Sequence, residues 1–233
     1  LAYSANKIIF NFYQHAPIIK SQYSLHKTLL RVPPNCRILC SGDITLKYFE
    51  SLPNCPTRLL QNAGSVKNIP PFESTDSLKK SILIAPEGTK LASLEQLKLG
   101  IDLAQNFKNL NFIIRLHPAF KSDSDLNSLQ IPKNLRVSRS TLALDFAESN
   151  ICIFRTSAVG IEAGALGILP IYYSENSEEL NPLFLFALDT LSFGSSEAIK
   201  NYFFNTENSF EFTRSMQNEF KKYFMKLNLA IFN

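Results

Sequence analysis

The sequence has no tryptophan and few glycines, cysteines and histidines. Its 233 residues include 8 glycines, 4 cysteines and 3 histidines, against 19 phenylalanines. Because glycine is sparse, a glycine that follows an apolar run marks a point where the backbone turns or approaches another group closely. At 45% hydrophobic residues, the chain can form one large or two small domains with cores of their own.

The cysteines are not spaced like a metal site. Cys36 and Cys40 flank one apolar run, Cys55 and Cys152 stand apart from them, and no Cys-x-x-Cys pair occurs. Zinc sites built from cysteine normally show such pairs. We therefore expect no bound metal, and we expect free thiols in a reducing compartment, which favours a cytoplasmic location.

Strong charge and long apolar runs are also missing. The net charge is only +4, and no basic tract is present, so we expect no nucleic-acid partner. No apolar run reaches the roughly 18–20 residues that span a bilayer, which leaves peripheral association with the inner face of a membrane open. The chain starts with "LAYSANK", without Met or a signal-peptide pattern, and we expect it to begin partway through a longer protein.

What the sequence does contain is an alternation of strand-like and helix-like segments in two blocks. The first block, 1–66, predicts strands at 7–13, 37–42 and 57–65, with Asp43 as the N-cap of a helix after the second strand. The segment 67–80 is rich in Pro, Ser, Thr and charge, as linkers between domains often are.

The second block, 81–233, has a clearer pattern. We expect a strand and a turn over 81–89 and further strands at 111–118, 134–140, 150–157 and 168–174. The expected helices are 91–107, 141–149, 157–167, 195–204 and 209–227. Ser93 and Gln96 have the spacing of a capping box at the start of the first helix. Because the strands are apolar throughout and alternate with helices, they predict an α/β fold with a doubly wound parallel sheet of order 3-2-1-4-5-6.

Polar residues follow three of these strands. In such a sheet, ligands bind beyond the carboxyl ends of the strands, where strands one and four part. The loops after the first and fourth strands lead into helices, and the N-terminus of a helix favours an anion. Pro118 restricts the backbone of His117, which could aim the imidazole into the cleft. The residues at these ends are Glu87, Gly88 and Thr89, then His117 and Pro118, then Arg155, Thr156 and Ser157, with Glu162 in the next helix.

Two of these stretches carry a family resemblance. "RLHP" at a strand end, followed about forty residues later by "TSAVGIEAGALGILPIYY", resembles the C-terminal nucleotide-sugar domain of GT-B-fold glycosyltransferases. The likeness is to bacterial surface-polysaccharide enzymes: sialyltransferases and polysialyltransferases, Kdo transferases and polyglycerol-phosphate polymerases. It covers about 81–174. The first block is similar to the late part of their N-terminal domain, with Ala16 where a glycine is expected. The resemblance therefore implies two Rossmann-like domains, the N-terminal one incomplete.

The resemblance also implies roles for single residues. His117 would bind the donor phosphate and assist departure of the leaving group, and Thr156 and Ser157 would hold that phosphate. Glu162 would hold the ribose hydroxyls. Further donor contacts would come from Glu87, Gly88, Thr89, Pro118 and Arg155. His15 would contribute from the other domain as a base or acceptor contact, and Gln14 and Arg115 would touch substrate, although a structural ion pair is an equal reading for Arg115.

The function implied is metal-independent transfer of a sugar from a nucleotide-activated donor, CMP- or CDP-linked. The acceptor would be a surface-polysaccharide glycan or glycolipid, and no cofactor is needed. Two alternatives stay open. A nucleotide-sugar epimerase of the same fold would need more acidic residues around the cleft than the sequence offers. A non-catalytic binding module is favoured by Ala16 and by the missing part of the N-terminal domain.

Overall fold

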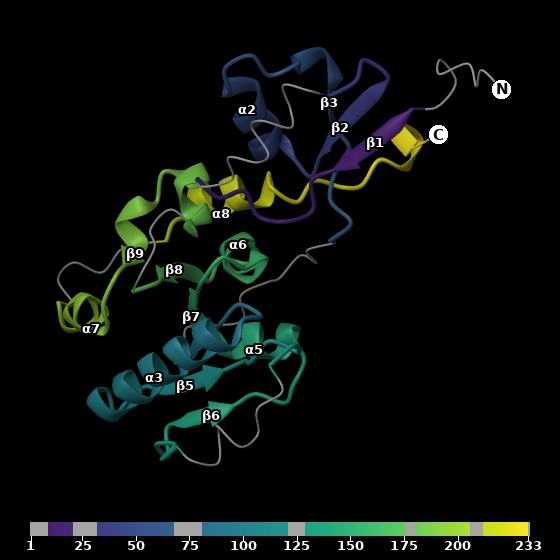
Figure 1. The fold of residues 1–233 in the computed structure, drawn as a ribbon. Coiled ribbons are helices and arrows are strands. Elements are labelled where there is room, and N and C mark those ends of the chain that lie inside the picture. The colour runs from purple at the N-terminus through teal and green to yellow at the C-terminus, as the bar shows by residue number, and fades with distance from the viewer. Residues whose placement is uncertain are drawn as a thin grey trace.

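The computed structural model describes residues 9–20, 32–67, 81–120, 129–175, 180–205 and 212–232. Its strands form two parallel sheets, as Figure 1 shows. The first has the order β1-β2-β3, built from β1 (Phe10–Tyr13), β2 (Cys36–Cys40) and β3 (Leu60–Asn62). The second has the order β6-β5-β4-β7-β8-β9, built from β4 (Ser81–Ala85), β5 (Asn111–Ile114), β6 (Leu135–Val137), β7 (Ser149–Phe154), β8 (Leu169–Tyr173) and β9 (Ser192–Phe193).

Helices connect these strands. The α-helices are α2 (Asp43–Ser51), α3 (Lys90–Asn106), α5 (Leu142–Glu148), α6 (Ala158–Ala165), α7 (Ser196–Phe204) and α8 (Arg214–Lys221). Short 3₁₀ helices cover Thr57–Leu59, Pro182–Phe186, Asp189–Leu191 and Leu229–Phe232.

The second sheet has the predicted topology. Counted along the chain, its strands lie in the order 3-2-1-4-5-6, and every pair is parallel. The central strands β4 and β7 are apolar except where they begin, at Ser81 and at Ser149 and Asn150, because their later residues are buried on both faces. Right-handed crossovers put α3 and α6 on opposite faces, because β5 and β8 lie on opposite sides of the β4–β7 pair. The predicted doubly wound α/β fold is confirmed.

Two local predictions were wrong. The N-cap of α2 is Gly42, and Asp43 is instead the first helical residue. The start of α3 is capped by Thr89, whose Oγ1 accepts a hydrogen bond from the backbone N–H of Ala92 at 3.3 Å. The Ser93 and Gln96 spacing is therefore no capping box, since Ser93 already lies inside the helix.

Other elements differ in extent. The predicted strand 57–65 is a 3₁₀ turn followed by the short strand β3, and the two-residue strand β9 was not predicted. Of the helix expected over 209–227, residues 209–211 lie outside the described residues. In the rest of that range, α8 starts after the N-cap Thr213 and ends at Lys221. Residues 68–80 lie outside the described residues, so the linker and the two domain boundaries stay predictions.

After α8 the chain returns to the first sheet, where the yellow C-terminal segment runs beside β1–β3 (Figure 1). Backbone hydrogen bonds join the N–H of Met225 to the Ser41 carbonyl at 3.2 Å and the N–H of Ser65 to the Met225 carbonyl at 2.8 Å. Two glycines allow this close approach. A Cβ on Gly42 would lie 2.1 Å from the carbonyl oxygen of Lys222, and a Cβ on Gly64, whose φ is +78°, would lie 2.2 Å from the carbonyl oxygen of Lys226. The segment 222–228 therefore covers the carboxyl ends of β2 and β3.

Aromatic packing fixes α8 before it reaches that sheet. Phe220 is fully buried and stacks on Phe186 with ring centroids 4.0 Å apart. Its ring occupies the space left by Gly164 on α6, where a Cβ would lie 2.4 Å from a ring carbon. The buried Tyr223 donates to the carbonyl of Ala16 at 3.2 Å, so the C-terminal segment contacts both blocks.

Candidate functional site

The candidate site lies at the carboxyl edge of the second sheet, beyond β4, β5 and β7. Because β4 stands between the other two strands, the loops that follow all three are neighbours. One direct contact confirms this. A Cβ added to Gly88, after β4, would lie 2.9 Å from Nδ1 of His117, after β5. The glycine therefore leaves the space that the imidazole occupies.

The ring of His117 is exposed and oriented by its own turn. Its Nδ1 accepts a hydrogen bond from the backbone N–H of Ala119 at 3.1 Å. An accepting Nδ1 carries a lone pair, so in the neutral ring the proton is on Nε2. The turn after the strand thus selects the tautomer and makes Nε2–H a hydrogen-bond donor.

Pro86 is buried, whereas Gly88 and Thr89 are exposed at the start of α3. The hydroxyl of Thr89 donates to Oε1 of Glu87 at 3.1 Å while its oxygen caps the helix. The hydroxyl of Ser93 donates to the carbonyl of Glu87 at 3.1 Å. This loop is therefore held in shape by its own side chains.

Arg155, after β7, is already paired. Its Nη1 lies 2.7 Å from Oε2 of Glu95 on α3, and the other oxygen of Glu95 accepts from the backbone N–H of Glu175 at 2.9 Å. The pair is largely buried, with both side chains about an eighth exposed. Nearby, burial raises the pKa of the Tyr172 phenol, and the positive charge of Arg155 partly offsets that rise.

Two donors in the loop after β7 make no hydrogen bond to the described residues. Nε of Arg155 and Oγ1 of Thr156 are buried, and neither makes a hydrogen bond within the described ranges. Leaving a buried polar group unpaired costs about 1–3 kcal/mol, so such groups are normally satisfied by water, an ion or a ligand. They stand where β4 and β7 part, which is the topological switch point of the sheet.

Ser157 and Glu162 belong to α6. Ser157 is the N-cap, and its Oγ accepts from the backbone N–H of Val159 at 3.0 Å. The carboxylate of Glu162 is 12% exposed and forms an ion pair with the ammonium group of Lys67, which follows the first block. Burial raises the pKa of the Cys152 thiol, and the negative charge of Glu162 adds to that effect.

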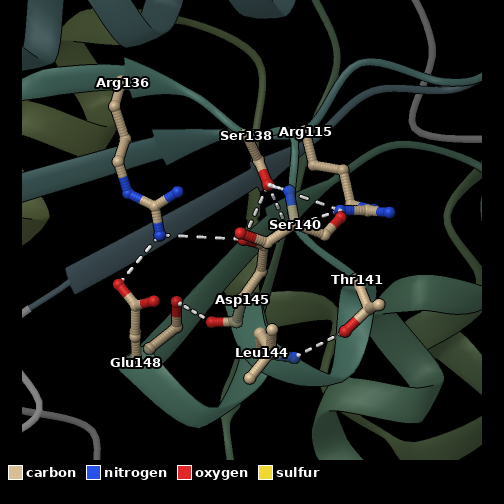
Figure 2. A network of polar contacts seen from close by, with 9 residues as sticks. Arg115, Arg136, Ser138, Ser140, Thr141, Leu144, Asp145 and Glu148 are labelled. Carbon is tan, nitrogen blue, oxygen red and sulfur yellow. Dashed lines mark hydrogen bonds and ion pairs between the residues drawn. The ribbon is translucent and has the colours of Figure 1, made fainter.

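Arg115 forms the structural ion pair that the sequence left as one of two interpretations. Its guanidinium lies 2.7 Å from the carboxylate of Asp145 and donates to the carbonyl of Ser140 at 2.6 Å, as Figure 2 shows. Asp145 is fully buried in α5. The arginine therefore joins β5 to α5.

Gln14 and His15 lie at the carboxyl end of β1, in the other sheet. The amide of Gln14 donates to the Tyr223 hydroxyl at 3.1 Å and accepts from Ser41 at 3.1 Å, so it holds the C-terminal segment. His15 is exposed. Within the described part of the chain, no hydrogen bond links His15 to His117.

Sequence reasoning missed the partners of these residues. Glu95, Asp145 and Lys67 pair with Arg155, Arg115 and Glu162 across elements far apart in the chain. One signal was available, since a charged residue at the end of a buried strand requires a partner. It did not indicate which acidic or basic residue would supply it.

Across the residues that the structure describes, no three His, Cys, Asp or Glu side chains converge as metal ligands. The same residues include no helix with the length and apolar character needed to cross a bilayer.

No protein-family model and no curated protein matches the chain. Solved structures do. A histidine variant of the wall teichoic acid polymerase TagF aligns with 97% of this chain and 66% of its own, at 11% identity and a TM-score of 0.50. A TagF structure soaked with CDPG aligns with 92% of this chain and 61% of its own, at 12% identity and a TM-score of 0.48. TarM aligns with 85% of this chain and 50% of its own, at 11% identity and a TM-score of 0.44. The chain thus spans 61–66% of the length of these TagF structures, and the likeness at 0.50 supports the GT-B-like fold.

Proposed function

We propose that the chain is the donor-binding part of a glycosyltransferase, with a CMP- or CDP-linked sugar bound at the carboxyl edge of the second sheet. The observation that carries the proposal is the pair of buried, unpartnered donors, Nε of Arg155 and Oγ1 of Thr156. Both belong to the loop that opens α6, at the switch point of the sheet. Phosphate oxygens accept hydrogen bonds from guanidinium and hydroxyl groups alike, and a helix N-terminus favours their charge.

His117 would serve the leaving group. When the bond between the anomeric carbon and the phosphate oxygen breaks, negative charge develops on that oxygen, and Nε2–H of His117 can donate to it. The acceptor hydroxyl forms the new bond to the anomeric carbon and gives its proton to a base. His15, on the first sheet, is our candidate for that base or for an acceptor contact.

Glu162 would bind the ribose, because a carboxylate can accept from two hydroxyls at once. The loop of Glu87 and Gly88 would line the pocket for the base or the phosphate. The proposed acceptor is a surface-polysaccharide glycan or glycolipid. This follows the resemblance of the "RLHP" and "TSAVGIEAGALG" stretches to surface-polysaccharide enzymes.

Thr156→Val tests the carrying observation. We expect the wild-type chain to bind CDP or CMP in calorimetric titration, and we expect the variant to bind about tenfold more weakly, as loss of one hydrogen bond to a charged group implies. Without ligand, the variant should be as stable as the wild type or more so, because it removes an unsatisfied hydroxyl.

Ser192→Ala is the matched control. Its hydroxyl is also buried without a partner, but it belongs to β9, at the far edge of the sheet. This variant should leave nucleotide binding unchanged. If the wild-type chain bound none of CMP, CDP, UDP and GDP, the proposal would be rejected. Turnover of a UDP-sugar without acceptor would indicate the epimerase instead, and transfer unaffected by His117→Ala would favour the non-catalytic module.

A further inference from the structure

We propose that Arg115, held by the buried carboxylate of Asp145, is the positioning residue for His117. It fixes the end of strand β5 so that the imidazole stands against the loop after β4, beside the switch point, in one orientation. The importance of His117 rests on the function proposed above, whereas the positioning itself can be measured without any ligand.

The contacts of Arg115 join three elements. It is the first residue after β5, and its backbone N–H donates to the carbonyl of Ile84 in β4 at 2.9 Å. Its Nη1 donates to the carbonyl of Ser140 at 2.6 Å and lies 2.7 Å from Oδ2 of Asp145. The main chain of Arg115 is thus bonded to β4 and its side chain to the loop after β6, and these two strands flank β5. Arg115 lies two residues before His117. The direction in which the chain leaves the strand is therefore set by this arginine.

Asp145 is the anchor of the network in Figure 2. Its carboxylate is fully buried and accepts from the hydroxyl of Ser138 at 2.7 Å. The backbone N–H of Ser138 donates to the carbonyl of Ile114, the last residue of β5, at 2.7 Å. The network therefore returns to the strand that leads to His117.

The other side of His117 is held by the turn that follows it. Its carbonyl accepts from the N–H of Phe120 at 2.8 Å, and its Nδ1 accepts from the N–H of Ala119 at 3.1 Å. The ring orientation thus depends on two supports, the turn after it and Arg115 before it. Changing the second support should weaken the hydrogen bond that selects the tautomer.

Arg136 supplies the matched comparison. It shares the carboxylate of Asp145, at 3.7 Å, and also pairs with Glu148 at 2.8 Å. It belongs to β6, however, and among the described residues its side chain pairs with Asp145 and Glu148 and not with the chain between β5 and His117. If the pairing with Asp145 served only stability, replacing either arginine should have the same effect on His117. If it positions His117, only the replacement of Arg115 should affect the imidazole.

The experiment compares Arg115→Lys with Arg136→Lys in the full chain. Lysine keeps the positive charge near Asp145, but its side chain is one bond shorter than that of arginine. Its ammonium group therefore does not reach the position from which Nη1 contacts both Asp145 and Ser140. The imidazole ¹⁵N resonances of His117 report its tautomer without ligand, and only 3 histidines are present to assign. We expect Arg115→Lys to move these resonances toward a mixture of tautomers and to weaken CDP binding about tenfold.

We expect Arg136→Lys to leave both the resonances and CDP binding as in the wild type. Equal shifts in the two variants, or unchanged His117 resonances in Arg115→Lys, would overturn the proposal. If Arg115→Lys does not fold, Ser138→Ala removes one hydroxyl from the network without changing charge, and it should move the same resonances less far. If Arg115→Lys shows the tautomer response but the wild-type chain binds no nucleotide, the proposed function is refuted and the positioning role of Arg115 stands.

Discussion

The carboxyl edges of the two sheets differ in what covers them. In the first sheet, the edges of β2 and β3 are closed by the chain itself, through backbone hydrogen bonds of Ser41 and Ser65 with Met225. In the second sheet, the corresponding edge carries an exposed imidazole and two buried donors that make no hydrogen bond to the described residues. Parallel sheets in general bind ligands at this edge. Among the described residues, the C-terminal segment covers this edge in the first sheet and not in the second.

Glycine takes a different part at each edge. Gly42 and Gly64 make room for backbone carbonyl groups of the C-terminal segment, whereas Gly88 makes room for the side chain of His117. A backbone held by its own hydrogen bonds cannot move aside, but a side chain can rotate. Adding one methyl group at each place therefore tests whether the two edges differ as described.

Gly42→Ala should have the largest effect. Its Cβ would lie 2.1 Å from the carbonyl oxygen of Lys222 and 2.7 Å from that of Tyr223, and both are backbone atoms. We expect a loss of about 3 kcal/mol in the free energy of unfolding, the upper part of the range for overpacking. Urea denaturation measures the loss, and limited proteolysis should cut the segment 222–232 faster than in the wild type.

Gly194→Ala is the control for this change. Its nearest neighbour would be the carbonyl oxygen of Ser174 at 3.9 Å, an ordinary van der Waals distance. Its midpoint in urea should stay close to that of the wild type. If Gly42→Ala unfolded at the same urea concentration as Gly194→Ala, the C-terminal segment would not cover the first sheet.

Gly88→Ala should change function more than stability. The atoms that its Cβ would meet, at 2.9 and 3.1 Å, belong to the imidazole of His117, and an exposed ring can rotate away. We expect the free energy of unfolding to change by less than about 1 kcal/mol, as for most surface substitutions. Displacing the ring should weaken CDP binding about tenfold in calorimetric titration. Unchanged affinity would show that the position of His117 does not matter for the ligand.

The open edge was predictable from the sequence and the closed edge was not. Strand order and the loops with Glu87, His117 and Thr156 follow from apolar runs that alternate with helices, because these patterns are local. The cover over β2 and β3 depends on contacts between residues about 180 positions apart, such as Gly42 with Lys222. No periodicity reports such a contact.

Local reasoning also failed where tertiary packing decided the outcome. Ser93 and Gln96 fit the spacing of a capping box, yet the chain enters α3 one turn earlier, at Thr89. Ser93 instead donates from inside the helix to the carbonyl of Glu87, which helps to shape the loop after β4. The pairing of Arg155 with Glu95 likewise depends on two elements that meet only in the fold.

Lys67→Met should have the smallest effect. It tests whether ion pairs or the C-terminal segment hold the two blocks together. Its ion pair with Glu162 is one link between them, and the lysine is 45% exposed. Glu162 is only 12% exposed, but replacing the exposed lysine opens its carboxylate to water on that side. We therefore expect a loss of about 1 kcal/mol in urea denaturation, smaller at high salt. Lys20→Met is the matched control, because Lys20 pairs with Asp189 of the second block at 3.1 Å with both side chains half exposed. A loss above about 2 kcal/mol in either variant would mean that ion pairs join the blocks. Small losses in both would leave that role to the C-terminal segment, whose backbone hydrogen bonds and buried Phe220 connect α6 to the first sheet.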